Sequence, residues 1–163
     1  MSGHLILAID IGKTGALALL SPAGDLIDIA DMPTLDGDGP AYRPGINAAL
    51  LAGIIRRWNP TSAIAEYVSA RPKEAPSGAF SFGRSKGVIE GVLGSQAVPV
   101  RFVTPAWWKR RVGIPPGAGM KDIARSKAIA HWPAHADLFA RVMDHDRAEA
   151  ALIGLAHIKE GQQ

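Results

Sequence analysis

Four acidic residues in this sequence have the types and positions needed to hold divalent cations. Asp10 ends an apolar run near the start of the chain, and Glu66 ends a second one. Asp146 and Glu149 stand three residues apart in a segment of helical character much further on. An unpaired carboxylate at the end of a buried element costs free energy, so a shared cation is a physical reason for such positions. Oxygen ligands from Asp and Glu suit Mg²⁺ or Mn²⁺ rather than zinc.

Four carboxylates are a sensible ligand set for two divalent ions, because they would repel one another without added positive charge. Two such ions about 4 Å apart stabilise both the attacking water and the leaving oxygen of a phosphodiester. Some of these acids also have structural explanations: Asp10 can cap a turn with Ile11 and Gly12. Asp146 and Glu149 can form a variant of the capping box. The set of four together predicts metal-dependent phosphate chemistry.

Apolar runs bounded by turn residues predict the elements that position these acids. Five strands are expected, at residues 4–10, 16–20, 26–32, 62–68 and 99–103. The short turns between the first three predict an antiparallel meander. If the strands that contain Asp10 and Glu66 are neighbours, both carboxylates emerge at the same edge of the sheet.

Helical spacing of apolar residues predicts the remaining elements. Helices are expected at residues 46–58, 79–97, 105–112 and 121–131, and from about 145 to 159. Asp146 and Glu149 share a face of the last helix, and we expect both in its first turn, where negative charge is favoured. The element order is that of an α/β domain with a mixed sheet. A length of 163 residues predicts a single domain over residues 1–163.

Two aromatic residues and a glycine series mark the second of these helices. Phe80 and Phe82 are expected in its core-facing part. Gly83, Gly87 and Gly91 recur at a four-residue spacing. We expect this spacing to allow close approach of a neighbouring element.

The composition is that of an ordinary globular protein, at 47% hydrophobic and 20% charged residues. The absence of cysteine excludes disulfides, thiolate zinc sites and a cysteine nucleophile, and it fits a reducing compartment. Apolar stretches are interrupted well before the ~18 residues that a transmembrane helix needs. The start of the chain lacks the basic region of a signal peptide. We therefore expect a cytoplasmic protein with no membrane partner.

Basic residues concentrate in the middle of the chain, although the net charge is only +3. Residues 1–50 carry a net charge of −4, residues 51–127 of +9 and residues 128–163 of −2. Aromatic residues interleave the basic ones at residues 56–58 and 107–111. Acidic clusters beside a basic field suit a polyanion that also needs a metal. Chance clustering of charges on a solvated surface is the other explanation.

On these residues the sequence resembles the RuvC-type Holliday-junction resolvases, bacterial or phage-encoded, of the RNase H-like nuclease superfamily. The resemblance covers roughly residues 4–158. Its most specific stretches lie at residues 8–12 with Gly15, 63–66, 82–87, 98–100 and 146–150. It implies an RNase H-like α/β fold, with a mixed five-stranded sheet of three antiparallel strands and then two parallel ones, flanked by helices. The family's metal-ligating acids fall onto Asp10, Glu66, Asp146 and Glu149. The last of these is usually Asp, so the arm here is one methylene longer.

The resemblance implies a Mg²⁺-dependent, structure-selective DNA endonuclease that resolves four-way junctions by paired symmetric nicks, in DNA recombination and repair. Two Mg²⁺ ions per active site are expected, with Mn²⁺ able to substitute. Asp10 would bridge them, and Glu66, Asp146 and Glu149 would complete their shells. A homodimer is expected, because a four-way junction has two-fold symmetry. The sequence names no branch-migration partner.

Basic residues are expected near the acids, because phosphodiester hydrolysis develops extra negative charge on the phosphate. By resemblance, Lys121 is assigned to the scissile phosphate and catalysis, and Lys109 to phosphate binding. Contacts to the DNA backbone are expected from Arg71, Lys73, Arg84, Lys86, Lys109, Arg110 and Arg111. Asp144 and His145 stand close enough in the sequence to replace or support Asp146.

Several aromatic and apolar residues beside these segments have more than one role open to them. Tyr67 or Val68 could wedge between base pairs of distorted DNA, although a core role is favoured. Trp107 and Trp108 could pack, stack on a base or join a subunit interface.

Three other functions are compatible with part of these motifs. The same chemistry could act on RNA or on other branched DNA, or the chain could be a non-catalytic junction-binding protein. The motif Asp-x-Gly-x-Thr-Gly at residues 10–15 also occurs in actin/sugar-kinase-type phosphotransferases. Those enzymes close two domains of this size over ATP, whereas this chain supplies one.

Overall fold

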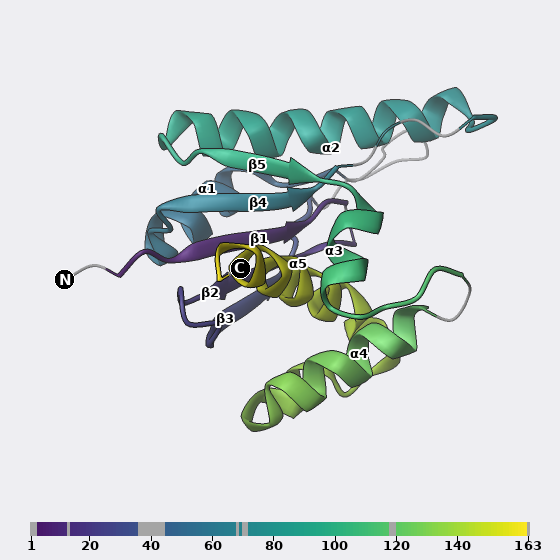
Figure 1. Cartoon of the computed structure of the whole chain (residues 1–163). Helices are drawn as coiled ribbons and strands as arrows, with labels where there is room; N and C mark the ends of the chain where they lie inside the picture. Colours follow the sequence, from purple (N-terminus) through teal and green to yellow (C-terminus); the bar gives the residue numbers. More distant parts are fainter. Residues whose placement is uncertain are drawn as a thin grey trace.

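The chain folds around a mixed sheet whose strands match the predicted ones in number and order. A computed structural model describes residues 3–12, 14–35, 45–67, 69, 72–117 and 120–162, except for the side chains of residues 120 and 121. The strands are β1 (Ile6–Asp10), β2 (Ala16–Leu20), β3 (Leu26–Asp31), β4 (Ser62–Glu66) and β5 (Val100–Val103). Their order across the five-stranded sheet is β3-β2-β1-β4-β5 (Figure 1).

The pairing of the strands confirms the expected topology. β1 pairs antiparallel with β2, and β2 with β3, whereas the pairs β1–β4 and β4–β5 are parallel. Ile9 is the partner of Ala65 across β1 and β4. The next residues, Asp10 and Glu66, therefore lie at the same edge of the sheet. β4 ends earlier than predicted, at Glu66, where its partner β5 also ends at Val103.

Helices account for most of the remaining chain. They are α1 (Ala48–Trp58), α2 (Pro76–Ser95), α3 (Pro105–Arg111), α4 (Met120–His131) and α5 (His145–Gly161). Two 3₁₀ segments that were not predicted, η1 (Pro133–Phe139) and η2 (Val142–Asp144), lie between α4 and α5; such short turns carry no clear apolar period. α2 begins earlier than predicted, because proline suits the first position of a helix. Among the described residues, no helix is both long and apolar enough to cross a membrane.

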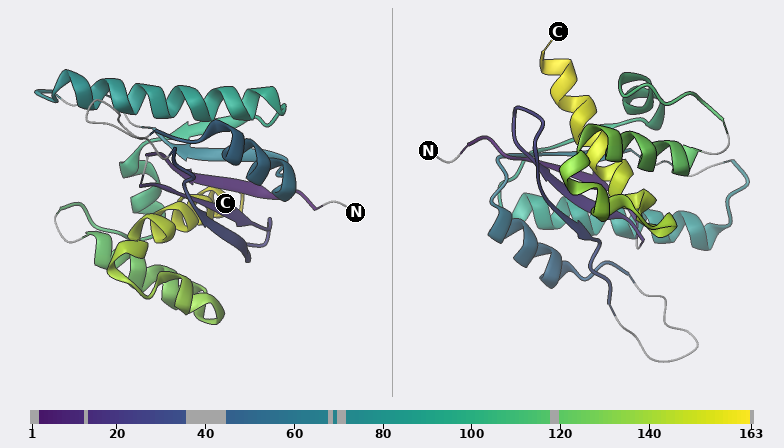
Figure 2. Two further views of the ribbon diagram at one scale, coloured as in Figure 1. Left: turned by 180° about the vertical axis from the view of Figure 1, so that it is seen from behind. Right: turned by 90° about the horizontal axis from the view of Figure 1, so that it is seen from below.

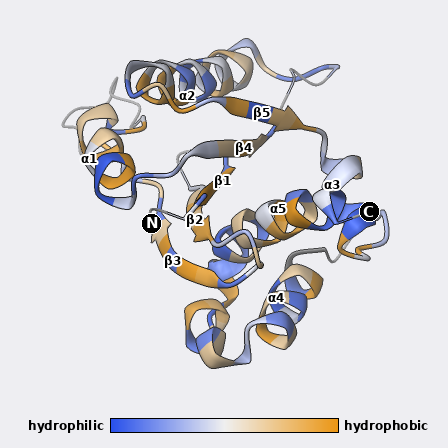
Figure 3. Ribbon diagram, turned by 60° about the vertical axis from the view of Figure 1, so that its left-hand side comes forward, coloured by the Kyte–Doolittle hydropathy of each residue, from blue (hydrophilic) through white to orange (hydrophobic). Residues whose placement is uncertain are grey.

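The helices form two layers, one on each face of the sheet (Figure 2). α1 and α2 cover the face that receives Leu7 and Ile9 of β1, and α3, α4 and α5 cover the face that receives Ala8. This alternation follows from the strand geometry, in which successive side chains point to opposite faces. Hydrophobic and hydrophilic stretches mix along α1, α2 and α4, as expected for helices with one solvated face (Figure 3).

Small residues let α5 lie close against β1 and β2. Ala8 and Ala18 are fully buried in the core that α5 shares with these strands. A methyl group on Gly154 would lie 2.5 Å from Leu20 Cδ1 and 3.0 Å from Ala8 Cβ. A larger residue at Gly154 would therefore push the helix or its neighbours aside. This close packing helps to set where the start of α5 lies relative to the end of β1.

The first half of α2 differs from expectation. Phe80 is 75% exposed and Phe82 is 37% exposed, so the prediction that both lie in the core is wrong. The start of the helix extends past the edge of the sheet (Figure 1), and its buried residues come later: Ser85, Ile89, Val92 and Leu93. A Cβ on Gly83, Gly87 or Gly91 would meet nothing within 4 Å. No element in the described part of the chain uses the close approach that this spacing allows.

Candidate metal centre

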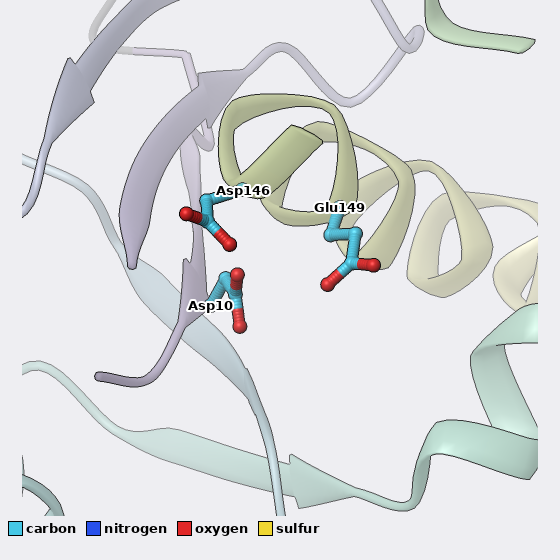
Figure 4. A group of neighbouring side chains, drawn as sticks. All are labelled: Asp10, Asp146 and Glu149. Carbon is cyan, nitrogen blue, oxygen red and sulfur yellow. The ribbon is translucent and has the colours of Figure 1, made fainter. Parts of the chain in front are cut away.

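Asp10, Asp146 and Glu149 point toward one another at one end of the sheet (Figure 4). One carboxylate oxygen from each lies within 4.8 Å of the others. Asp10 is the last residue of β1. Asp146 lies in the first turn of α5 and Glu149 just beyond that turn, not within it as predicted. Carboxylate oxygens at this spacing suit a hard divalent cation, so the three side chains fit Mg²⁺ or Mn²⁺.

A tight turn after β1 supports the position of Asp10. The Gly15 N–H donates to Gly12 O over 3.0 Å, and Gly15 O accepts from the Met32 N–H over 2.9 Å. A side chain on Gly15 would overlap the backbone carbonyl oxygen of Asp10. The glycine at this position therefore allows the chain to turn back tightly against the residue that carries the buried carboxylate.

Burial and repulsion between negative charges raise the pKa values of Asp10 and Glu149. The pKa of Asp10 is well above its ordinary value, first because the carboxyl is buried and then because other negative charges lie nearby. In decreasing order these are the charges of Glu149, Glu66 and Asp146. The pKa of Glu149 is also raised, by burial and then by Glu66, although the charge of Lys109 opposes this. The acids resist joint ionisation, and a bound cation would remove that resistance.

Glu66 lies beside the cluster and accepts a hydrogen bond from an indole. Its charge raises the pKa of both Asp10 and Glu149. Among the described residues, the group of oxygens within 4.8 Å of one another does not extend to Glu66. The Trp108 Nε1–H donates to Glu66 Oε2. The four predicted acids therefore gather in one region, three of them at ligand spacing and the fourth alongside.

Asp144 and His145, which precede Asp146, have different partners. Asp144 is only 2% exposed and accepts from Arg141, with Nη2 2.7 Å from Oδ1 and the backbone N–H 2.8 Å from Oδ2. Burial alone would raise the pKa of Asp144, but the bonds from Arg141 outweigh it and lower the pKa. His145 Nε2 lies 3.1 Å from Asp146 Oδ1, and its Nδ1 lies 3.1 Å from Val142 O. His145 thus supports Asp146, whereas Asp144 is engaged by Arg141.

A pocket of about 440 Å³ opens beside Asp146. Its wall includes Arg141 and Met143, from the segment that leads into α5, and His145, the first residue of α5. This pocket opens one side of the acidic cluster, at Asp146, to solvent.

Two of the predicted basic residues lie near the ends of the strands that carry the acids. Lys109 is close enough to Glu149 for its charge to lower the pKa of that residue. Its Nζ lies 5.4 Å from the ring centroid of Trp108. Lys86 Nζ lies 4.9 Å from the ring centroid of Tyr67, the residue that follows Glu66. Both lysines stand over aromatic rings, where a cation is favoured.

The other predicted DNA contacts include exposed residues and residues that the structure does not describe. Three of them are exposed on the surface: Lys73, Arg84 and Arg110. Arg71 and the side chain of Lys121 lie outside the described residues, as does Val68. The assignments of Arg71 and Lys121 therefore stay predictions.

The aromatic residues beside the centre take different positions. Tyr67 is 43% exposed, against the favoured core role, and packs edge-to-face on Phe102 with ring centroids 6.5 Å apart. Trp107 packs against the guanidinium of Arg111, whose Cζ lies 3.9 Å from the ring centroid. Arg111 also pairs with Glu160 over 3.3 Å. The guanidinium of Arg111 is therefore engaged within the fold.

The contact between Trp108 and Glu66 was not predicted. The sequence does indicate where α3 starts, and this start sets the direction of Trp108. Thr104 accepts from the Trp107 N–H over 3.3 Å, and Pro105 takes the first position of α3. With the start of α3 fixed in this way, the helical period turns Trp108 toward the core and leaves Lys109 beside it.

No protein-family model matches the sequence, and no curated protein matches it either. Solved structures do match. RuvC of Thermus thermophilus in complex with a Holliday junction substrate is 15% identical, with a TM-score of 0.61, over 97% of this chain and 94% of that chain. A second Thermus thermophilus RuvC structure is 16% identical, with a TM-score of 0.55, over 97% and 95%. The fowlpox virus resolvase in complex with its substrate Holliday junction DNA is 15% identical, with a TM-score of 0.59, over 98% and 99%.

At these identities the likeness concerns the fold. It spans nearly the whole of each chain, and the sheet order and the mixture of parallel and antiparallel pairs agree with it. The chain therefore has an RNase H-like α/β fold, of the kind found in RuvC and the fowlpox virus resolvase.

Proposed function

We propose that this chain is a Mg²⁺-dependent endodeoxyribonuclease that resolves four-way DNA junctions. The observation that carries the proposal is the cluster of Asp10, Asp146 and Glu149 at the end of the central strand. Burial and neighbouring acids raise the pKa of Asp10, as expected where a cation belongs. The fold supports the choice of substrate, because two of the similar structures hold Holliday junctions.

Each residue of the site has a distinct task in this proposal. Two Mg²⁺ ions, replaceable by Mn²⁺, would be held by Asp10, Glu66, Asp146 and Glu149. When bound, the cations supply the Lewis acidity for hydrolysis to a 5′-phosphate and a 3′-hydroxyl. Lys109 provides positive charge beside Glu149 for a phosphate that gains negative charge. His145 orients Asp146 through the contact at 3.1 Å.

Branched DNA would lie over the part of the chain that carries most of the positive charge. Residues 51–127 have a net charge of +9, and this range includes Lys73, Arg84 and Arg110 on the surface. Contacts of this kind hold the DNA backbone without reading its sequence. A binding constant that falls steeply with salt concentration would support this assignment.

A homodimer is part of the proposal, because the two nicks of a symmetric junction need two sites related by two-fold symmetry. The exposed Phe80 on α2 and the open face at Gly83 and Gly87 offer a surface for a second copy. Sedimentation equilibrium tests this: the wild type should be a dimer and Phe80→Asp a monomer. A wild-type chain that stayed monomeric on junction DNA would contradict it.

The deciding experiment compares labelled substrates with and without Mg²⁺. A four-way junction should be cut into two nicked duplexes only with Mg²⁺, whereas plain duplex should remain intact. Cleavage of a fork or of RNA at the same rate would show that the four-way junction is not the preferred substrate. Junction binding without metal-dependent cleavage would indicate a non-catalytic binding protein. Stabilisation by ATP would favour a phosphotransferase.

A further inference from the structure

We propose that Trp108 is a positioning residue for the metal centre, holding the Glu66 carboxylate beside Asp10 and Glu149. The proposal rests on the function proposed above, since it gives the indole a task only if Glu66 serves a cation. It assigns to Trp108 no contact with the substrate.

The contact joins two elements that the sequence places far apart. Trp108 lies on α3 and is fully buried, and its Nε1–H donates to Oε2 of Glu66 at the end of β4. Its ring belongs to the core that also contains Ala148 and Leu152 of α5. A side chain packed in this way has little freedom, so the direction of its N–H bond is set by the core.

The chemistry of an indole suits this task. Its N–H only donates, so it cannot bind a cation, and it engages a single oxygen of Glu66. It is also neutral, so it leaves the negative charge of Glu66 available to a cation. A lysine or arginine in the same place would compete with the cation for that charge. Hydrogen bonds that orient ligating carboxylates typically change metal affinity by about 10- to 100-fold when removed.

Two other tryptophans provide matched controls. The Trp58 Nε1–H donates to Asp28 Oδ2 over 2.8 Å, and the Trp132 Nε1–H donates to Gly24 O over 2.9 Å. Both indoles are buried, so replacing either by phenylalanine also removes a buried donor and part of a ring. Neither acceptor belongs to the acidic cluster. Their variants therefore measure what such a change costs when the metal centre is not involved.

The test is calorimetric titration of Mn²⁺ into the metal-free chain without DNA. We expect Trp108→Phe to weaken Mn²⁺ binding by about 10- to 100-fold, and Trp58→Phe and Trp132→Phe to bind as the wild type does. Thermal unfolding of all three variants shows whether each is folded. Equal Mn²⁺ affinity in folded Trp108→Phe and wild type would overturn the proposal.

A second variant separates the hydrogen bond from the packing of the ring. Benzothienylalanine at Trp108 keeps the size of the ring system and replaces the N–H by sulfur, so it should fold and should still weaken Mn²⁺ binding. Wild-type affinity in this variant would overturn the proposal.

A double-mutant cycle tests whether Trp108 acts through its partner. In a Glu66→Ala background, which removes the acceptor, the further change Trp108→Phe should leave Mn²⁺ affinity unchanged, whereas an additive loss would overturn the proposal. A wild-type chain that bound no Mn²⁺ at all would overturn the proposed function as well. Wild-type binding with an unaffected Trp108→Phe would overturn the positioning role alone.

Discussion

Arg147 and Asp31 form a two-pronged ion pair between α5 and the end of β3, with Nε and Nη2 each 2.7 Å from one carboxylate oxygen. Arg147 stands between Asp146 and Glu149 in the sequence, and adjacent residues of a helix do not face each other. The pair therefore ties the start of α5 to the sheet without using the face that carries the two acids.

We expect Arg147→Met to lower the free energy of unfolding by roughly 1 kcal/mol, the upper end for an exposed pair. The pKa of Asp31 is lowered, chiefly by the hydrogen bond from Arg147. The pair therefore stabilises the fold above the ordinary pKa of 3.8, and this contribution is lost as the pH falls through the lowered value. Urea unfolding of the wild type and of Asp31→Asn at neutral and acid pH measures this contribution of the pair. Asp137→Asn on η1 is the control. A difference between the wild type and Asp31→Asn that persisted at the lowest pH would contradict this.

Asp10→Asn should abolish cleavage while retaining junction binding. We expect a loss of roughly 10³-fold or more, the scale of one strong transition-state interaction. Binding of a labelled junction in Ca²⁺, beside cleavage in Mg²⁺, separates the two effects. A variant that still cut at the wild-type rate would remove Asp10 from the centre.

The same substitution should raise the melting temperature in EDTA at neutral pH. The pKa of Asp10 is raised, first by burial, so its charged form is disfavoured in the folded state. Its contribution to stability is complete at low pH and is lost as the pH rises above the ordinary value of 3.8 toward the raised one. Asparagine carries no such charge. Mn²⁺ should then stabilise the wild type more than the variant, and equal stabilisation of both would argue against a shared cation.

Gly154→Val should disturb the centre from a distance. The added atoms meet Leu20 and Ala8, and overpacking of this kind costs about 1–3 kcal/mol, with roughly 2–4 °C of melting temperature per kcal/mol. Cleavage should fall further than stability explains, because α5 carries Asp146 and Glu149. The control is Gly53→Ala on α1, where a Cβ would meet nothing within 4 Å and alanine should stabilise the helix by up to about 1 kcal/mol. Wild-type activity in a folded Gly154→Val chain would show that α5 tolerates a shift.

Lys109→Met should lower kcat by roughly 10²-fold, because positive charge beside the reacting phosphate is lost. It should also move the rise of activity with pH to higher pH, since Lys109 lowers the pKa of Glu149. Arg110→Met, at the exposed neighbouring position, should weaken junction binding without this shift. Identical pH profiles for wild type and Lys109→Met would contradict the role of Lys109.

Much of the fold could be predicted because its strands are buried and its turns are short. β1 and β2 are apolar runs that end in turn residues, so their positions were visible, and so was the edge shared by Asp10 and Glu66. Phe80 was predicted to be buried but is exposed, because residue type alone does not say that α2 extends past the sheet. The engagement of Asp144 by Arg141 was missed for a related reason: it depends on the 3₁₀ segment η2, which the periodicity does not show.

The position of Gly154 has a consequence for when the acidic cluster assembles during folding. Asp10 belongs to the first strand, and Asp146 and Glu149 to the last helix, so no short stretch of chain holds the cluster. Contacts between distant parts of a chain form slowly, because closing a long loop costs entropy. Until α5 docks against β1 and β2 at Gly154, the three carboxylates are not assembled, and under the proposed function a partly folded copy would not cut DNA.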